Sequence, residues 1–244
     1  MRLITLSIII LGFAWAPSAY AESANACVTC HASLAPSARR AHDFSEWQGS
    51  IHARAGVMCE KCHGGNPGVS DAAGAHAGVV PATQKGSPLY YMRIQDTCGT
   101  CHGAEAAEFK KSFHFSELKR TGRGPTCTTC HGSMATAILT PVQMEQQCSL
   151  CHVLRGGASQ ALVTLNQADA AVKRWAASLA KAAPAGKAGT AEEAILKAQQ
   201  SALAEAKRKW HSLDMSDVLN RARSIIQAAQ AAMQGLQLKS GGAR

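Results

Sequence analysis

One pentapeptide pattern, Cys-x-x-Cys-His, accounts for all ten cysteines of this 244-residue chain. It occurs five times: motif 1 is Cys27–His31, motif 2 is Cys59–His63, motif 3 is Cys98–His102, motif 4 is Cys127–His131 and motif 5 is Cys148–His152. In each copy two thiols stand three residues apart, and an imidazole follows the second thiol directly. A chain built on five such units must fold around whatever they hold.

This spacing is the attachment signature of c-type haem. Each thiol can form a thioether with one porphyrin vinyl group, and the next imidazole then becomes an axial ligand of the iron. The expected attachment residues are Cys27, Cys30, Cys59, Cys62, Cys98, Cys101, Cys127, Cys130, Cys148 and Cys151, and the expected proximal ligands are His31, His63, His102, His131 and His152. Zinc sites and disulfides are the alternatives, but neither requires a histidine after every second cysteine.

The second axial ligand decides what each haem can do. A second histidine saturates the iron and favours electron transfer, whereas an open position admits a substrate. The five histidines outside the motifs match the five haems in number, and we expect them to be distal ligands: His42, His52, His76, His114 and His211. Met58, Met92 and Met134 are the alternative ligands, and the sequence leaves open which histidine serves which haem.

Three of these histidines have informative surroundings. His52 and His114 stand shortly before motifs 2 and 4, where a short helix could present an imidazole to a neighbouring haem. His211 follows Trp210 at the end of a long predicted helix. We therefore expect His211 to be a ligand supplied by the C-terminal part of the chain.

The first 21 residues have the pattern of a secretory signal peptide. Arg2 precedes an apolar run from Leu3 to Trp15, and a small-residue cleavage site ends at Ala21. The run is short for a membrane span; an uncleaved anchor is the alternative. Covalent haem attachment in bacteria takes place outside the cytoplasmic membrane, so we expect a periplasmic or otherwise extracytoplasmic protein with no stable membrane span after cleavage.

The rest of the chain divides into two regions of different composition. Residues 22–157 contain all five motifs but few large apolar side chains, so we expect a pentahaem domain that is mainly α with much irregular structure, wrapped around a haem stack. Glycine- and proline-containing segments at residues 64–68 and 123–125 predict turns between haem units. Residues 158–244 predict a C-terminal helical region, either a hairpin or a three-helix tail.

Apolar residues in this C-terminal region recur at steps of three and four. The first stripe runs from Leu162 to Leu179, a Thr190–Glu193 capping box begins a second helix that reaches about Trp210, and Asp214 caps a third. We expect the stripes to pack on one another and to cover the haems; a partner or membrane surface is the alternative.

The net charge of +9 would suit a nucleic-acid-binding protein. Two propionates on each of five haems, partly balanced by one positive charge on each ferric haem core, would leave the mature protein with only a small net charge. We therefore expect no binding to nucleic acid.

Two segments around the motifs resemble a known group of multihaem cytochromes. Residues 49–65, which lead into motif 2, and residues 125–133, which surround motif 4, are similar to hydroxylamine oxidoreductase, pentahaem nitrite reductase and the tetrahaem electron carrier of nitrifiers. Residues 210–214 resemble the C-terminal helical part of the larger enzymes. The resemblance implies closely packed haem pairs, distal ligands from upstream histidines and a C-terminal histidine that reaches back to an early haem.

The enzymes of this group have features that the chain lacks. The nitrite reductases have lysine in place of the motif histidine at the catalytic haem, whereas all five motifs of this chain end in histidine. Hydroxylamine oxidoreductase needs more haems and a crosslinking tyrosine, for which only Tyr90 and Tyr91 remain after signal cleavage. The resemblance therefore supports the haem architecture more than the enzymatic activities.

These observations together predict a periplasmic pentahaem c-type cytochrome that relays electrons between redox partners through bis-histidine haems. The partners would be a donor and an acceptor protein, such as a membrane quinol dehydrogenase and a terminal reductase. One alternative is a small multihaem reductase of an oxidised nitrogen, sulfur or selenium species with one open haem. Another is a haem-bearing subunit of a complex or filament, and the sequence leaves the oligomeric state open.

Overall fold

The computed structural model describes residues 25–34, 44–153, 157–182 and 189–241, and side chains up to residue 238. These residues are mainly helical and contain no strand, which confirms the predicted mainly α class. The predicted signal peptide at residues 1–21 and the predicted ligand His42 lie outside the described residues.

The motif region, which comprises described residues 25–153, consists of short helices joined by loops. Its helices are α1 (Ala26–Ser33), α2 (Phe44–Gln48), α3 (Ile51–Arg54), α4 (Glu60–His63), α5 (Ala72–Ala75), η2 (Tyr91–Arg93), α6 (Ile94–Gly99), α7 (Gly103–Phe109), α8 (Phe113–Thr121), α9 (Cys127–His131) and α10 (Pro141–Ser149). Its buried apolar residues are Ala26, Ile94, Ala106, Phe109, Leu118 and Met144. So small an apolar core agrees with the scarcity of large side chains in this part of the sequence.

Each of the two predicted glycine turns lies close to the backbone of another segment. Gly65 has a φ of +91°, and a Cβ at this position would lie 2.7 Å from the carbonyl oxygen of Ala75. Gly124 has a φ of +146°, and its Cβ would lie 3.1 Å from the carbonyl oxygen of His114. Glycine is needed at both positions because any side chain would meet backbone in a strained conformation. Both turns therefore hold the backbone close to a histidine, since His76 directly follows Ala75.

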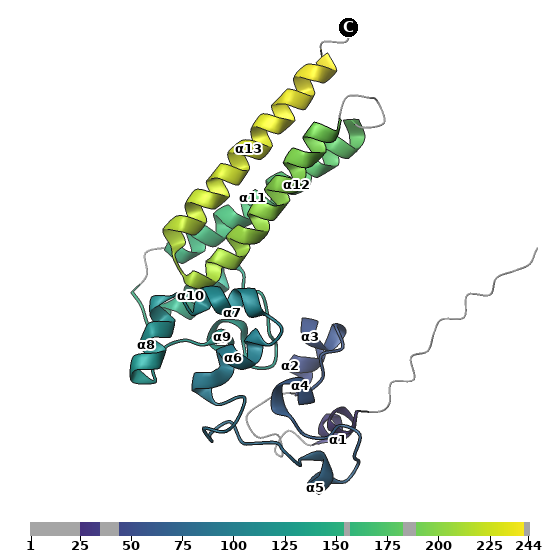
Figure 1. The fold of residues 1–244 in the computed structure, drawn as a ribbon, viewed down its shortest axis with the longest axis vertical. Coiled ribbons are helices and arrows are strands. Elements are labelled where there is room, and N and C mark those ends of the chain that lie inside the picture. The colour runs from purple at the N-terminus through teal and green to yellow at the C-terminus, as the bar shows by residue number, and fades with distance from the viewer. Residues whose placement is uncertain (1–24, 35–43, 154–156, 183–188, 242–244) are drawn as a thin grey trace, which may run out of the picture.

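The helical tail, which comprises described residues 157–241, projects away from the motif region (Figure 1). It consists of α11 (Gly157–Ala182), α12 (Thr190–Lys209), the single turn η4 (Trp210–Ser212) and α13 (Met215–Gly241). The three long helices pack on one another, and the predicted stripes line their shared core, which includes Leu165, Val172, Trp175, Leu203, Val218, Ile225, Ala229 and Leu236. The prediction of mutual packing is confirmed. None of the described helices is long and apolar enough to cross a membrane.

The helix ends in the tail confirm one predicted cap and correct another. Asp214 caps α13, since its Oδ1 accepts a hydrogen bond from the Asp217 backbone N–H at 3.1 Å. The capping box predicted at Thr190 and Glu193 is wrong by one residue: α12 begins at Thr190, and Glu192 accepts a hydrogen bond from the Gly189 N–H. The absence of a side chain at the Gly189 cap explains why the sequence pattern pointed to Thr190.

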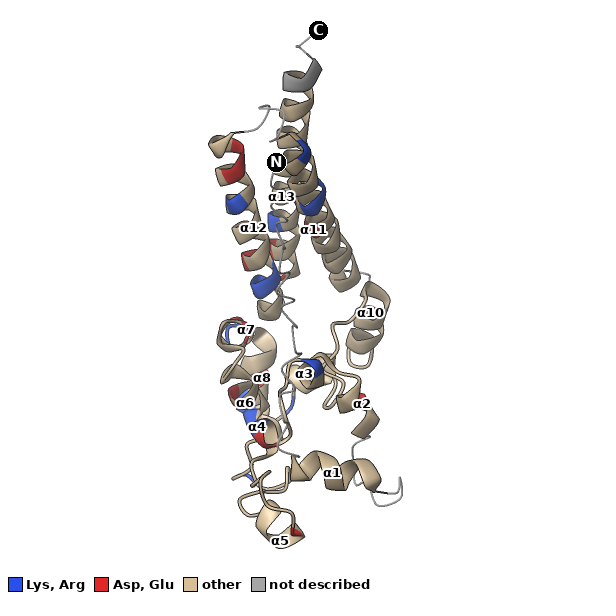
Figure 2. Cartoon of the chain, turned by 90° about the vertical axis from the view of Figure 1, so that its right-hand side faces the viewer, with Lys and Arg blue, Asp and Glu red and all other residues tan. Residues whose placement is uncertain are grey.

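Charge along α12 follows the direction of its helix dipole. Its first turn carries Glu192 and Glu193, and its last turn carries Lys207, Arg208 and Lys209 (Figure 2). Acidic groups stabilise a helix near its N-terminus and basic groups near its C-terminus. The basic end of α12 is the end that faces the motif region (Figure 1).

Candidate functional site

Each described motif forms one turn of helix or helix-like chain. In motifs 2, 3 and 5 the backbone N–H of the histidine donates to the carbonyl of the first cysteine, at 2.9, 2.9 and 3.0 Å. Motifs 1 and 4 lie within α1 and α9. Residues three apart in such a turn share one face. The two thiols of each motif therefore point the same way, as attachment to one flat porphyrin requires.

Motifs 1, 2 and 3 lie next to one another. Burial raises the pKa of the Cys59 thiol to about 11, and the nearby Cys27 thiol of motif 1 adds to that shift. Burial also raises the pKa of Cys62, with further contributions from Cys98 and Cys101 of motif 3. Thiols interact in this way only at short range. The first three motifs are thus neighbours in the order in which they occur along the chain.

The same order continues through motifs 4 and 5. The neighbouring Cys127 thiol is the largest cause that raises the pKa of Cys98, ahead of burial. Burial raises the pKa of Cys130, and the Cys148 thiol of motif 5 adds to that shift. In agreement, α6 packs on α9 and α9 packs on α10. The five motifs consequently form one uninterrupted series in space.

Four of the motif histidines each face a histidine from outside the motifs. The pairs and the distances between their ring centroids are His31–His76 at 6.1 Å, His52–His102 at 5.9 Å, His114–His152 at 5.7 Å and His131–His211 at 6.2 Å. In the third pair the two Nε2 atoms face each other at 3.4 Å. Each pair joins segments that lie at least 38 residues apart in the sequence.

Backbone carbonyls orient several of these rings. The Nδ1 atom of His76 lies 2.7 Å from the Ala72 carbonyl, and that of His131 lies 2.8 Å from the Ala137 carbonyl. His211 has the same arrangement, with its Nδ1 atom 3.2 Å from the Arg208 carbonyl oxygen. An Nδ1–H that donates to a carbonyl fixes the tautomer and leaves Nε2 unprotonated for a metal.

Partial burial favours the neutral form of three of the non-motif histidines. It is the main cause that lowers the pKa of His52, His114 and His211 below the ordinary histidine value. The facing motif histidine lowers each pKa further, because two cationic imidazoles would repel each other. Neutral imidazole is the form that ligates iron.

The paired imidazoles are spaced nearly as an iron ion between them requires, although the His114 and His152 Nε2 atoms lie somewhat closer than two bonds of about 2 Å allow. Metal–imidazole bonds of about 2 Å on opposite sides of one metal ion put two ring centroids about 6 Å apart. The four described pairs have that separation. All ten cysteines are free thiols. In the described parts of the chain, no three His, Cys, Asp or Glu side chains converge on a point that could hold a metal ion without a porphyrin.

Exposed apolar side chains next to these histidines also fit haem. Phe113 adjoins His114 and is 79% exposed, and Val153 adjoins His152 and is 100% exposed. Leu150, between the two cysteines of motif 5, is 74% exposed. Exposed apolar side chains offer surface that a bound apolar group can cover. A porphyrin attached to motif 5 would cover this side of the molecule.

His63 and His42 are the remaining histidines of the predicted ligand set. His63 is the last residue of α4 and is half-buried. His42 lies outside the described residues. In the four described pairs a histidine, and not Met58, Met92 or Met134, faces the motif histidine.

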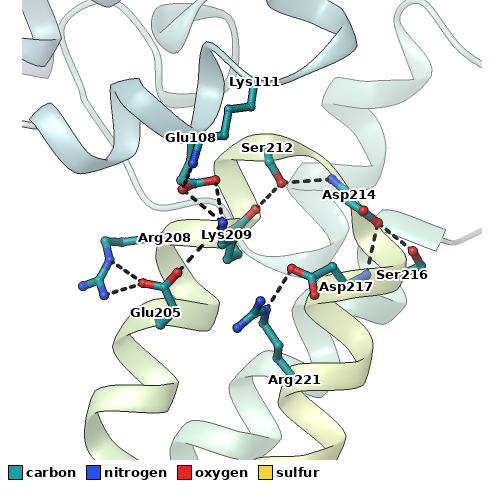
Figure 3. A network of polar contacts seen from close by, with 10 residues as sticks. All are labelled: Glu108, Lys111, Glu205, Arg208, Lys209, Ser212, Asp214, Ser216, Asp217 and Arg221. Atoms are coloured by element: carbon teal, nitrogen blue, oxygen red, sulfur yellow. Dashed lines mark hydrogen bonds and ion pairs between the residues drawn. The ribbon is translucent and has the colours of Figure 1, made fainter.

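Four residues that the sequence did not single out lie on the segments next to the His131–His211 pair. Thr136 and Leu213 are the non-glycine residues with positive φ among those described, at +43° and +60°. Thr136 precedes the carbonyl that orients His131, and Leu213 follows η4. Glu108 and Lys209 form an ion pair between α7 and the tail, at 3.2 Å (Figure 3). No local pattern marks Glu108 and Lys209, because 101 residues separate them.

Comparison with known proteins gives one match. Residues 14–64 match the model of the family described as Cytochrome c554 and c-prime. This segment contains motifs 1 and 2. No curated protein and no solved structure matches the chain. The family match, together with the motifs, supports a c-type cytochrome that binds haem c covalently and transfers electrons.

Proposed function

We propose that the protein is an exported pentahaem c-type cytochrome that relays electrons between redox partners through bis-histidine haems. The observation that carries this proposal is the pairing of four motif histidines with four non-motif histidines at centroid separations of 5.7–6.2 Å. Pairing of this kind favours an electron carrier over an enzyme, because it fills both axial positions of each iron.

The proposed ligand sets follow from these pairs. Each haem would be held by the two cysteines of its motif and by one of the sets His31 with His76, His102 with His52, His131 with His211 and His152 with His114. By count, motif 2 would use His63 together with His42. When bound, haem c supplies an iron that changes between the ferric and ferrous states.

The chain's own residues set the conditions for that change. The thiols fix each porphyrin to a rigid helical turn, and the backbone carbonyls of Ala72, Ala137 and Arg208 hold three imidazoles in the ligating tautomer. Two fixed ligands per iron leave little to rearrange when its oxidation state changes. The uninterrupted series of motifs supports transfer from motif 1 to motif 5 or in the reverse direction.

The proposal assigns a role to each of the two regions of the chain and a location to the protein. Residues 22–157 would be the pentahaem domain, and residues 158–244 would be a helical region that contacts it at one end (Figure 1) and supplies His211. The signal-like residues 1–21 support a periplasmic or other extracytoplasmic location. The partners would be a donor and an acceptor redox protein, such as a membrane quinol dehydrogenase and a terminal reductase.

Haem number and electron number test this proposal together. The intact mass of the secreted protein should exceed that of its polypeptide by five haems, and a reductive titration should take up five electrons per chain. A variant with Cys127 and Cys130 both changed to alanine should contain one haem fewer and take up one electron fewer per chain. Four or fewer haems in the parent protein, or a parent haem that reduces nitrite catalytically, would contradict the proposed carrier.

A further inference from the structure

Glu108 is the one ionisable side chain among the buried residues that the structure describes, with 8% of its surface exposed. It lies near the end of α7, which begins directly after motif 3. The Nζ atom of Lys209 lies 3.2 Å from each of its carboxylate oxygens, and the Nζ of Lys111 lies 2.6 Å from one of them (Figure 3). A buried carboxylate with two cationic partners is strongly held in place.

Lys209 connects this carboxylate to the turn that carries His211. It is the last residue of α12, two positions before His211, and its side chain is 23% exposed. Its carbonyl accepts a hydrogen bond from the Ser212 hydroxyl at 2.8 Å, and the Arg208 carbonyl orients the His211 ring. An ion pair that holds the Lys209 side chain in place therefore also restricts the η4 turn that follows it.

The packing of α7 shows why this contact matters for His211 in particular. Helix α7 packs on both α12 and η4, and it also packs on α6, which in turn packs on α9 and its His131. Glu105, one turn before Glu108 on α7, is close enough to His211 to influence its pKa. The Glu108–Lys209 pair thus ties the element that carries His211 to the same group of helices that carries His131.

We propose that the Glu108–Lys209 ion pair is the positioning contact that holds His211 opposite His131 and so keeps the motif 4 iron closed to small ligands. The proposal rests on the proposed function, because it requires a haem at motif 4 with His211 as its distal ligand. Glu108 and Lys209 are positioning residues: neither touches His131, and each acts through the η4 turn.

The chain offers a clean variant and a matched control. In Lys209→Met, Glu108 keeps Lys111 as a partner, so the buried carboxylate is not left without a cation. In Lys207→Met, a lysine of the same helical turn is lost, but its partner at 2.6 Å is Asp169 of α11, inside the tail. The two variants have the same chemistry and differ in whether the lost contact reaches the motif region.

The test measures carbon monoxide binding to the reduced five-haem protein and the high-spin fraction of the ferric protein. Lys209→Met and Glu108→Gln should each raise carbon monoxide affinity at one haem by about tenfold, and the double variant should add little, because both changes remove one interaction. Lys209→Arg and Lys207→Met should both have the carbon monoxide affinity and the high-spin fraction of the parent protein.

His211→Ala separates failure of this inference from failure of the proposed function. If His211→Ala does not open one haem, the assigned ligand and hence the proposed site are wrong. If His211→Ala opens one haem while Lys209→Met behaves like Lys207→Met, the positioning role alone is overturned. Opening of several haems at once in Lys209→Met would also overturn it, because a contact at η4 acts on one pair.

Discussion

The two histidines of the His131–His211 pair are held by strained backbone on both sides. Thr136 lies in the loop whose Ala137 carbonyl orients His131, and Leu213 ends the turn that carries His211. A non-glycine residue in the left-handed region costs about 1–3 kcal/mol and persists where surrounding contacts over-determine it. This strain indicates that the contacts around both rings fix their positions.

Replacing Thr136 with glycine should raise the free energy of unfolding of the holoprotein by about 1 kcal/mol, since glycine adopts positive φ without a Cβ clash. The buried Thr136 hydroxyl has no hydrogen-bond partner, so its removal sacrifices no bond. Thermal unfolding followed by circular dichroism measures the effect. Thr136→Ala is the control, because it removes the hydroxyl but keeps the strained φ; equal stabilisation by both variants would show that φ is not the cause.

The four described imidazole pairs differ in the angle between their planes, which should distinguish their haems by electron paramagnetic resonance. His131 and His211 are the most nearly parallel at 24°, and His114 and His152 are the most nearly perpendicular at 68°. Parallel ligand planes separate the iron d orbitals that interact with the rings, whereas crossed planes leave them close in energy. Ring orientation is set by the residues around each ligand.

His211→Ala should therefore remove a moderately anisotropic low-spin ferric signal, and His114→Ala should remove the most anisotropic one. Low-temperature electron paramagnetic resonance spectra of the two variants, compared with the spectrum of the parent protein, show which signal each variant loses. Loss of the same signal in both variants would contradict the two separate pairs.

At the scale of elements, the helical tail is a conventional apolar bundle, whereas the motif region is not. Trp175 of α11 is completely buried against Leu179, Ala229 and Leu236. Trp175→Ala should lower the stability of the tail by about 3–5 kcal/mol, because it removes a large core side chain.

The turn that carries His211 joins two helices of this bundle. In the parent protein, the motif 4 haem should therefore become accessible to cyanide at a lower urea concentration than the other four haems.

Urea titration followed by helix content and by the haem absorption band measures both effects. Ile195→Ala is the matched control, since Ile195 lies on α12 with half its surface exposed. If Trp175→Ala and Ile195→Ala have the same urea midpoint, the bundle core is not where the structure locates it.

The elements were predictable to different degrees. Apolar periodicity predicted α11, α12 and α13, because a packed helix repeats its buried side every three to four residues. The first residue of α12 was misplaced by one, since Gly189 provides a cap through its backbone and leaves no side-chain signal. The short helices that carry His52 and His114 were expected from their position before motifs 2 and 4.

At the scale of the whole molecule, the chain should need its haems to fold the motif region but not the tail. Large buried apolar residues are few among those described between residues 25 and 153, so the porphyrins would supply most of the apolar surface buried there. Limited proteolysis of a haem-free variant, with all ten cysteines changed to alanine, should degrade the motif region and spare a fragment that contains α11–α13. Equal protection of the two regions would contradict this account.

The sequence alone did not predict which non-motif histidine faces which motif histidine. The attachment motifs are local, so five residues suffice to recognise each one. A pair such as His52 and His102 instead depends on the path of the intervening loops, and His52 faces motif 3 although motif 2 is nearer in the chain. The Glu108–Lys209 contact was hidden for the same reason, because Lys209 is one of three consecutive cations and only the packing of α7 distinguishes it.

The near-infrared magnetic circular dichroism of the ferric holoprotein tests the central claim most directly, because it reports the axial ligands of every haem at once. The account predicts that all five haems are low-spin, with the ligand-to-metal charge-transfer band typical of two histidines and an intensity that corresponds to five haems per chain. A high-spin band that accounts for one haem in five, or a band typical of histidine with methionine, would contradict it.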